Sequence, residues 1–161
     1  MGVFGMGPPA FFVGNATDSA GNIFQTRNDA PNVQIFKVPA TGPPNQVIYD
    51  YMAFGPANVL DKGIILDTNG DIIAAESSSL ANINGTLARI TQGGIRTVIY
   101  TVPNAFFSSS VKDPAGNFVV PEIPSPVASP PPAVLVTVTP AGVRTVIFTF
   151  PAGTDASAIT F

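Results

Sequence analysis

The sequence predicts an all-β protein in which one four-stranded antiparallel unit occurs three times. A turn motif, Asp-x-x-Gly-Asn/Asp, recurs at nearly equal intervals at Asp18, Asp67 and Asp113. Almost the same segment appears twice, as RTVIYTVP at 96–103 and as RTVIFTFP at 144–151. The apolar segments are short, rich in Val, Ile, Phe, Tyr and Thr, and bounded by Gly, Pro, Asn or Asp, which is typical of strands. No stretch keeps a helical period for three turns.

The turn motif marks the first hairpin of each unit. Its aspartate can accept backbone N–H bonds at the start of the turn, and its glycine can take the positive φ that closes a hairpin. These glycines are Gly21, Gly70 and Gly116. In the second copy Asp67, Asn69 and Asp71 also have the spacing of a calcium loop, but the glycine comes too early and Ser78 stands where that loop needs a glutamate. The motif therefore predicts a turn and no metal site.

The distribution of apolar residues within the strands indicates how the units pack. The second strand of a unit is apolar without alternation, at 72–75 and again at 118–120, which predicts a sheet covered on both faces. Simple alternation along the fourth strand places Arg96, Val98 and Tyr100 on one face. Small antiparallel sheets stacked face to face are the blades of a β-propeller. A sandwich would leave one polar face on each strand, and a prism is the other three-fold β architecture that fits three repeats.

The repeats divide the chain into one domain over residues 1–161. Blade 1 is expected at about 10–57, blade 2 at about 58–104 and blade 3 at about 105–151. The remaining residues, 152–161, fall in register with the segment that opens blade 3, so they predict one extra C-terminal strand. The chain is thus expected to be a half-propeller of three blades plus a strand.

The middle unit resembles the repeat of a known propeller family. From Gly63 to Tyr100 it reads an apolar strand, the Asp-x-x-Gly-Asp turn, an apolar strand ending in Glu, a Gly-x-Leu-x-Arg-Ile strand and a glycine turn before a fourth strand. This order resembles the NHL-repeat and virginiamycin B lyase-like six-bladed β-propellers. The resemblance implies a blade for each unit. It does not carry over the lyase activity, because those lyases use a histidine and this chain has none.

Three blades cannot close a ring, because propellers typically have four to eight. Two chains could form a six-bladed ring with two-fold symmetry, or each chain could lend its tail to the next in a head-to-tail polymer. A third interpretation is that the sequence is a piece of a longer propeller. An unpaired strand edge exposes N–H and C=O groups and favours association. The candidate assembly residues in the terminal strand are Thr154, Ala156, Ser157, Ile159 and Phe161.

The composition excludes several kinds of chemistry. The chain has no His and no Cys, so it cannot carry a Ser-His-Asp or Cys-His centre, and we expect no catalytic residue, cofactor or metal. Glu76 and Glu122 end the second strands of blades 2 and 3, where Arg27 stands in blade 1. These three are candidates to face a central channel as ligand-binding or acid–base groups. The structural interpretation is that the repeated glutamates bond the Ser/Thr-rich loop or pair with Arg89.

Charge and hydropathy limit the partners. The formal net charge is −3 with basic residues scattered singly, which argues against nucleic acid. No apolar run approaches the ~18 residues of a membrane helix, and the N-terminus lacks the basic start of a secretory signal. Only 11% of residues are charged, a composition that suits extracellular proteins or particle surfaces packed against copies of themselves.

These observations predict a non-catalytic structural protein that assembles with copies of itself. The alternative is a ligand-binding propeller module or a carboxylate-based enzyme, in a closed dimer or within a longer chain. A proline-rich tract at 121–132 is expected to form an extended arm between the second and third strands of blade 3.

Overall fold

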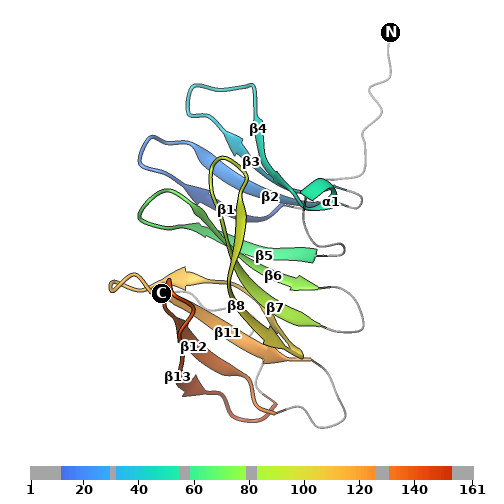
Figure 1. Ribbon diagram of the computed structural model, residues 1–161, viewed down its shortest axis with the longest axis vertical. Coiled ribbons are helices and arrows are strands. Elements are labelled where there is room, and N and C mark those ends of the chain that lie inside the picture. The colour runs from blue at the N-terminus through green and yellow to red at the C-terminus, as the bar shows by residue number, and fades with distance from the viewer. Residues whose placement is uncertain (1–11, 30–31, 55–58, 79–82, 126–130, 154–161) are drawn as a thin grey trace.

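The computed structural model describes residues 12–29, 32–54, 59–78, 83–125 and 131–153. Figure 1 shows three antiparallel sheets stacked one upon the next, each made from consecutive strands of the chain. This arrangement confirms the prediction of an all-β chain with three propeller-type blades. The predicted terminal strand, with its assembly residues from Thr154 to Phe161, lies outside the described residues.

Strand order follows chain order in all three sheets. Blade 1 contains β1 (Phe12–Thr17), β2 (Ile23–Asp29), β3 (Asn32–Val38) and β4 (Gln46–Asp50). Blade 2 contains β5 (Val59–Leu66), β6 (Ile72–Ser78), β7 (Asn84–Ile90) and β8 (Arg96–Pro103). Blade 3 contains β9 (Ala105–Phe107), β10 (Val111–Lys112), β11 (Phe118–Pro124), β12 (Val134–Val138) and β13 (Arg144–Thr149).

Two elements differ from the sequence prediction. The first strand of blade 3 is broken into β9 and β10, which both pair with β11. Three consecutive serines separate them, and serine side chains compete for nearby backbone groups. A short helix, α1 (Tyr51–Phe54), follows β4. Asp50 begins it by accepting the N–H groups of Met52 and Ala53 on Oδ1, at 2.9 and 3.2 Å, as an N-cap does.

The predicted turn chemistry is confirmed in all three blades. The N–H of Asp18 donates to the carbonyl of Asn22 at 3.0 Å, and its Oδ1 accepts the N–H of Asn22 at 2.9 Å. The aspartates of blades 2 and 3 close the same ring of backbone and carboxylate bonds. Each motif glycine has a φ near +80°: 81° at Gly21, 80° at Gly70 and 86° at Gly116. The aspartate and the glycine therefore perform the roles that the motif predicts.

The buried residues form two cores, and each core lies between adjacent blades. The first joins blades 1 and 2 through Phe24, Ile35, Ile48, Tyr49, Tyr51, Ile64, Ile72, Ala74 and Ile90. The second joins blades 2 and 3 through Ile73, Ala75, Leu87, Phe107, Phe118, Val120, Val136 and Val138. Successive residues of β6 face opposite cores, because side chains alternate along a strand. This explains why the middle of that strand is apolar without alternation.

A β-bulge changes the faces of the fourth strand. Ala88 pairs with Val98 but Leu87 pairs with Tyr100, so Ile99 is an extra residue. The same shift occurs around Ile48 in blade 1 and Ile147 in blade 3. The alternation prediction that put Val98 and Tyr100 on one face is therefore wrong. The bulge turns Tyr100 toward the following blade.

No helix of the described residues combines the length and apolar character that a membrane crossing requires.

The first strands of blades 1 and 2 meet at the inner edges of their sheets, where backbone lies against backbone. A Cβ added at Gly14 in β1 would lie 2.8 Å from the Cα of Gly63 and 3.0 Å from the amide nitrogen of Ile64 in β5. Only glycine permits this approach.

We predict that Gly14→Ala separates the inner strands and lowers the free energy of unfolding by about 1–3 kcal/mol, the usual cost of overpacking. The control is Gly93→Ala, where the nearest atom to an added Cβ would be 3.7 Å away. That change should be neutral or stabilise by about 0.4–1 kcal/mol through the unfolded chain. Urea unfolding followed by circular dichroism measures both. Equal stability of the two variants would contradict close packing of β1 on β5.

Candidate functional site

Glu76 is held between blades 1 and 2 by donors from both. Arg96, at the start of β8 in the same blade, donates from Nε to Oε1 at 3.1 Å and from Nη2 to Oε2 at 2.5 Å. Tyr51, at the end of blade 1, donates its hydroxyl to Oε1 at 2.8 Å. The glutamate is only 1% exposed, and a buried charge is tolerated when it is paired and hydrogen-bonded. We call this group the junction clamp.

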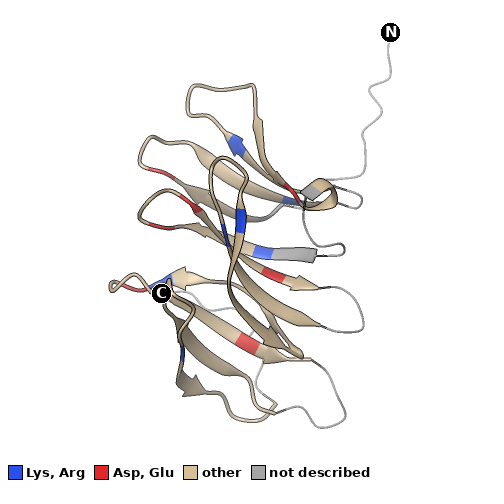
Figure 2. Ribbon diagram, in the orientation of Figure 1, with Lys and Arg blue, Asp and Glu red and all other residues tan. Residues whose placement is uncertain are grey.

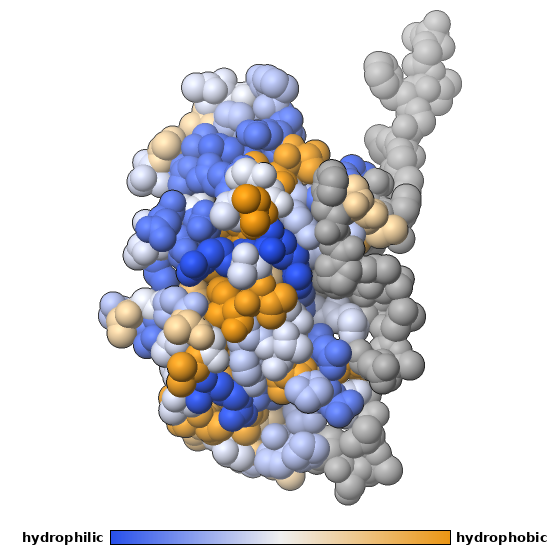
Figure 3. Space-filling view, viewed as in Figure 1, coloured by the Kyte–Doolittle hydropathy of each residue, from blue (hydrophilic) through white to orange (hydrophobic). Residues whose placement is uncertain are grey.

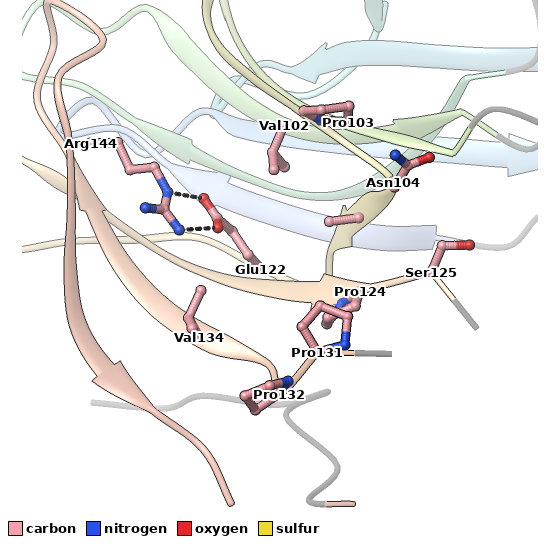
Figure 4. A pocket seen from close by; sticks show the side chains of 11 residues that line it. Val102, Pro103, Asn104, Glu122, Pro124, Ser125, Pro131, Pro132, Val134 and Arg144 are labelled. Carbon is pink, nitrogen blue, oxygen red and sulfur yellow. Dashed lines mark hydrogen bonds and ion pairs between the residues drawn. The ribbon is translucent and has the colours of Figure 1, made fainter. Parts of the chain in front are cut away.

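The second junction repeats the clamp with Glu122. Arg144, at the start of β13, donates from Nε at 2.9 Å and from Nη2 at 2.6 Å, as the dashed lines in Figure 4 show. Tyr100 of blade 2 donates its hydroxyl to Oε1 at 2.9 Å. Figure 2 shows the acidic segments on β6 and β11 at corresponding places in successive sheets. Each clamp therefore joins an arginine of its own blade to a tyrosine of the preceding blade.

The clamps show where the sequence-predicted site residues lie. Glu76 and Glu122 lie at the blade junctions, where their oxygens accept hydrogen bonds from arginine and tyrosine. Their partner is not Arg89, whose Nε lies 3.4 Å from Oδ2 of Asp67. Arg27 holds the equivalent place in blade 1, because it pairs with Gln34 as Glu76 pairs with Thr86. Within the described ranges, no group of three His, Cys, Asp or Glu side chains could hold a metal ion.

The clamps also change the pKa values of Arg96, Arg144 and Tyr100. The hydrogen bonds that Arg96 donates to Glu76 raise the pKa of Arg96 above its ordinary value, and those that Arg144 donates to Glu122 do the same for the pKa of Arg144. Burial, and then the bond to Glu122, raise the pKa of the Tyr100 hydroxyl to about 12. Both arginines therefore stay charged, and the phenol of Tyr100 stays protonated, at neutral pH.

A second contact repeats beside each clamp. The bulge carbonyl of one blade lies against a glycine turn of the next. A Cβ at Gly94 would lie 2.8 Å from the carbonyl oxygen of Ile48, and one at Gly142 would clash with that of Ile99. Gly42 has the same place in the turn of blade 1, but nothing lies within 4 Å of its added Cβ. Within the described part of the chain, no bulge carbonyl lies against this glycine.

A pocket of about 460 Å³ opens at the second junction, beside the Glu122 clamp. Figure 4 shows the Glu122–Arg144 pair on one side and prolines on the other. Its lining includes Val102, Asn104, Val134, Pro103, Pro124, Pro131 and Pro132. Val102 corresponds to Tyr51 of blade 1, since each comes two residues after the tyrosine that follows the bulge.

The outer strand of blade 3, β13, is more exposed than its counterparts β4 and β8. We call the side of a blade that faces the next blade its forward face. Phe148 pairs with Leu135 just after the bulge and so matches Tyr49 and Tyr100. Phe148 is 52% exposed and Ile147 is 49% exposed, whereas Tyr49 and Ile48 are 4% and 7% exposed. Figure 3 shows apolar side chains gathered on the side of the molecule that carries β8 and β13.

The backward face of blade 1 is open in the same way. Ile23 begins β2 as Ile72 begins β6 and Phe118 begins β11. Ile23 is 38% exposed, but the other two are 0% and 1% exposed because the preceding blade covers them. Among the residues that the structure describes, these two faces have no neighbouring blade, unlike the faces at the two junctions.

The sequence reasoning missed four of the six clamp residues, namely Tyr51, Arg96, Tyr100 and Arg144. A signal was present, because the arginine that opens the repeated RTVI segment recurs together with a glutamate in the same blade. The tyrosines had no such signal. Tyr51 and Tyr100 come from different positions in their blades, and the bulge decides which way each points.

Comparison with solved structures supports the propeller fold. A virginiamycin B lyase from Staphylococcus aureus matches with a TM-score of 0.51 and 16% identity, over 88% of this chain and 56% of that one. The extracellular domain of a putative hybrid two-component system from B. thetaiotaomicron matches at 0.60 and 14%, over 88% and 17%. A protein of unknown function from Bacteroides caccae matches at 0.51 and 15%, over 88% and 46%.

The chain therefore spans between about a sixth and just over half the length of these structures. No family model matches the chain, and no curated protein does. At these identities the similarity shows a propeller-type fold, as the repeat resemblance predicted.

We predict that Glu76→Gln lowers the free energy of unfolding by about 3 kcal/mol, because it leaves the charge of Arg96 buried without its partner. Glu122→Gln should cost less, since the side chain of Arg144 is 35% exposed and that of Arg96 is 16% exposed, and water screens the exposed one. The control is Asp71→Asn on the hairpin turn of blade 2, expected within about 0.5 kcal/mol of the parent. Urea denaturation compares the three. A larger loss at Glu122 than at Glu76 would contradict the exposure argument.

We also predict a pH dependence from Tyr100. Its folded-state pKa of about 12 exceeds the ordinary value of about 10, so its contribution to stability is complete below pH ~10 and is lost as the pH rises to ~12. The unfolding free energy of the parent should fall more steeply across this window than that of Tyr100→Phe. The chain has three tyrosines and no tryptophan, so phenolate absorbance reads the titration directly. If the tyrosine that is present in the folded parent and absent from Tyr100→Phe titrates at the ordinary pKa of about 10, the assignment is refuted.

Proposed function

We propose that this chain is a non-catalytic structural module, a half-propeller that completes its ring by packing blade 3 against blade 1 of another copy. One observation carries the proposal. The outer part of the forward face of blade 3 and the backward face of blade 1 expose residues whose counterparts at the two inner junctions are buried or part-buried. A copy that supplied the missing neighbour would bury Ile147 and Phe148, each contributing about 1.5–3 kcal/mol if fully buried.

The two open faces depart from the clamp in complementary ways. At the inner junctions a tyrosine hydroxyl meets a glutamate. At the open faces the tyrosine position holds Phe148, which has no hydroxyl, and the glutamate position holds Arg27, which needs no donor. The clamp arginine is also replaced, by Asn45, which directly precedes Gln46 as Arg96 precedes Thr97. A guanidinium over a phenyl ring is a favourable cation–π pair. The proposed junction therefore has a cation–π contact in place of the hydrogen bond from a tyrosine hydroxyl to a glutamate.

The strand order bears on how the copies would meet. In blade 1 all four positions are filled, by β1 to β4, so another chain's terminal segment would have to add at a sheet edge. We therefore place the main contact on the blade faces and give residues 154–161, with Ile159 and Phe161 as candidate anchors, a secondary part. If two copies close on each other the result is a six-bladed ring, and if they do not it is a head-to-tail filament.

Two further parts of the proposal rest on composition and on clamp geometry. The absence of His and Cys and the engagement of both glutamates by arginine favour a role without catalysis. The low charge content favours a place outside the cell or on a particle surface, and one of the similar structures is an extracellular domain. The alternative is a ligand-binding propeller module or a carboxylate-based enzyme, in a closed dimer or within a longer chain whose other blades meet the open faces.

The test is self-association of the 161-residue chain, measured by sedimentation velocity over a range of concentrations. We predict a two-chain particle or a larger series. Arg27→Glu should dissociate it, because the new carboxylate meets a phenyl ring and has no arginine. Adding Phe148→Tyr and Asn45→Arg rebuilds the inner type of clamp and should restore association. The control is Val98→Glu, which puts a charge on the exposed rim of blade 2.

The chain ended at Gly153 separates the faces from the terminal segment. If this truncation stays associated and Arg27→Glu does not, the faces carry the contact. A parent that stays monomeric at all concentrations would refute the proposal and favour the longer-chain alternative. Failure of the triple variant to reassociate would refute the pairing of Phe148 with Arg27.

A further inference from the structure

The first junction is filled by two tyrosines. Tyr49 and Tyr51 pack edge to face with ring centroids 4.9 Å apart, and both are buried, at 4% and 1% exposure. The hydroxyl of Tyr51 reaches Glu76. The Tyr51 ring is therefore part of the clamp at this junction, and it packs beside the glutamate.

The second junction has only one of these rings. Tyr100 corresponds to Tyr49, and it takes over the hydroxyl bond to the clamp glutamate. The place of Tyr51 is held by Val102, which has no ring and no hydroxyl. The pocket opens at this place, because Val102, Glu122 and Arg144 all line it. Tyr100 stacks on the buried ring of Phe107 at 6.2 Å, and the pocket lies beside the clamp glutamate at the sequence position that Tyr51 occupies in blade 1.

We propose that this pocket binds a phenolic ring, with the hydroxyl donated to Glu122. Its volume of about 460 Å³ lies within the usual range of ligand pockets, ~300–1,000 Å³, and exceeds the ~150 Å³ that suffices for benzene. The walls suit a flat apolar ring, since four prolines and two valines line it. The inference concerns a single chain and does not depend on association between copies.

Glu122 retains acceptor capacity for such a ligand. A carboxylate has about four acceptor sites. Described residues fill two on Oε1, from Tyr100 and Arg144, and one on Oε2, from Arg144. A phenol entering the pocket would donate to Oε2. A hydroxyl that donates to a carboxylate makes a charge-assisted hydrogen bond, which is stronger than a neutral one.

The test titrates the ¹⁵N-labelled protein with p-cresol and follows the amide spectrum. We expect saturable shifts at Val102, Asn104 and Val134, and binding of toluene about five- to tenfold weaker, because it lacks the hydroxyl. A capped Gly-Tyr-Gly peptide forms the second arm. Peptide binding tighter than that of p-cresol identifies a protein side chain as the source, and the reverse identifies a free phenol. Unsaturable shifts, or equal affinity for toluene, would overturn the proposal.

Two variants fill the pocket from opposite sides. Val102→Tyr restores the ring of the first junction, and it should weaken p-cresol binding at least tenfold while raising the melting temperature. Val134→Phe closes the pocket from β12 and should also abolish binding. The control is Val98→Tyr, which places the same ring on the exposed rim of β8 and should leave binding unchanged. If both filling variants are folded by circular dichroism and bind like the parent, the ligand does not occupy this pocket. If neither folds, the proposal rests on the parent's p-cresol and toluene affinities.

Discussion

A carboxylate buried between two sheets needs hydrogen-bond donors, and in this protein both sheets supply them. The packing within each blade and between neighbouring blades depends on these bonds. Each clamp glutamate sits on the second strand of its blade and faces backward. The arginine that neutralises it opens the fourth strand of the same blade, which fixes how the sheet's outer edge meets its centre. The tyrosine comes from the preceding blade, which fixes the distance and register between neighbours. One charged residue thus couples the folding of a blade to its docking.

The bulge in the fourth strand is what lets the tyrosine reach across. Without the extra residue, strict alternation would put the ring of Tyr100 on the same face as Val98, away from the following blade. The bulge also presents a carbonyl, and the next blade meets it with a glycine that has no Cβ to clash. Clamp, bulge and glycine turn form one repeated docking device. Blade 3 has the forward half of the device and blade 1 has the backward half, each with altered clamp residues.

Repetition in this chain constrains the junctions but leaves them free to differ in detail. The clamp needs one hydroxyl, and either of two positions in the preceding blade can supply it. Blade 1 uses Tyr51, in a short helix that Asp50 begins, and keeps Tyr49 as packing. Blade 2 uses Tyr100 and carries Val102 where the second ring would be. The same device therefore yields a filled junction and a junction with a pocket.

The all-β class, the three units, their hairpin turns and the covering of both sheet faces could all be predicted from the sequence. Those features are local: a strand's composition and a turn's Asp and Gly lie within a few residues of each other. The sequence also marked Glu76 and Glu122 as a repeated pair, but it did not identify their partners. Arg96 lies on the far side of the intervening strand β7, and Tyr51 lies in another blade, so only the tertiary structure could bring them together. It decided the role of each tyrosine as well, because an inserted bulge residue reverses a strand's faces while leaving its composition unchanged.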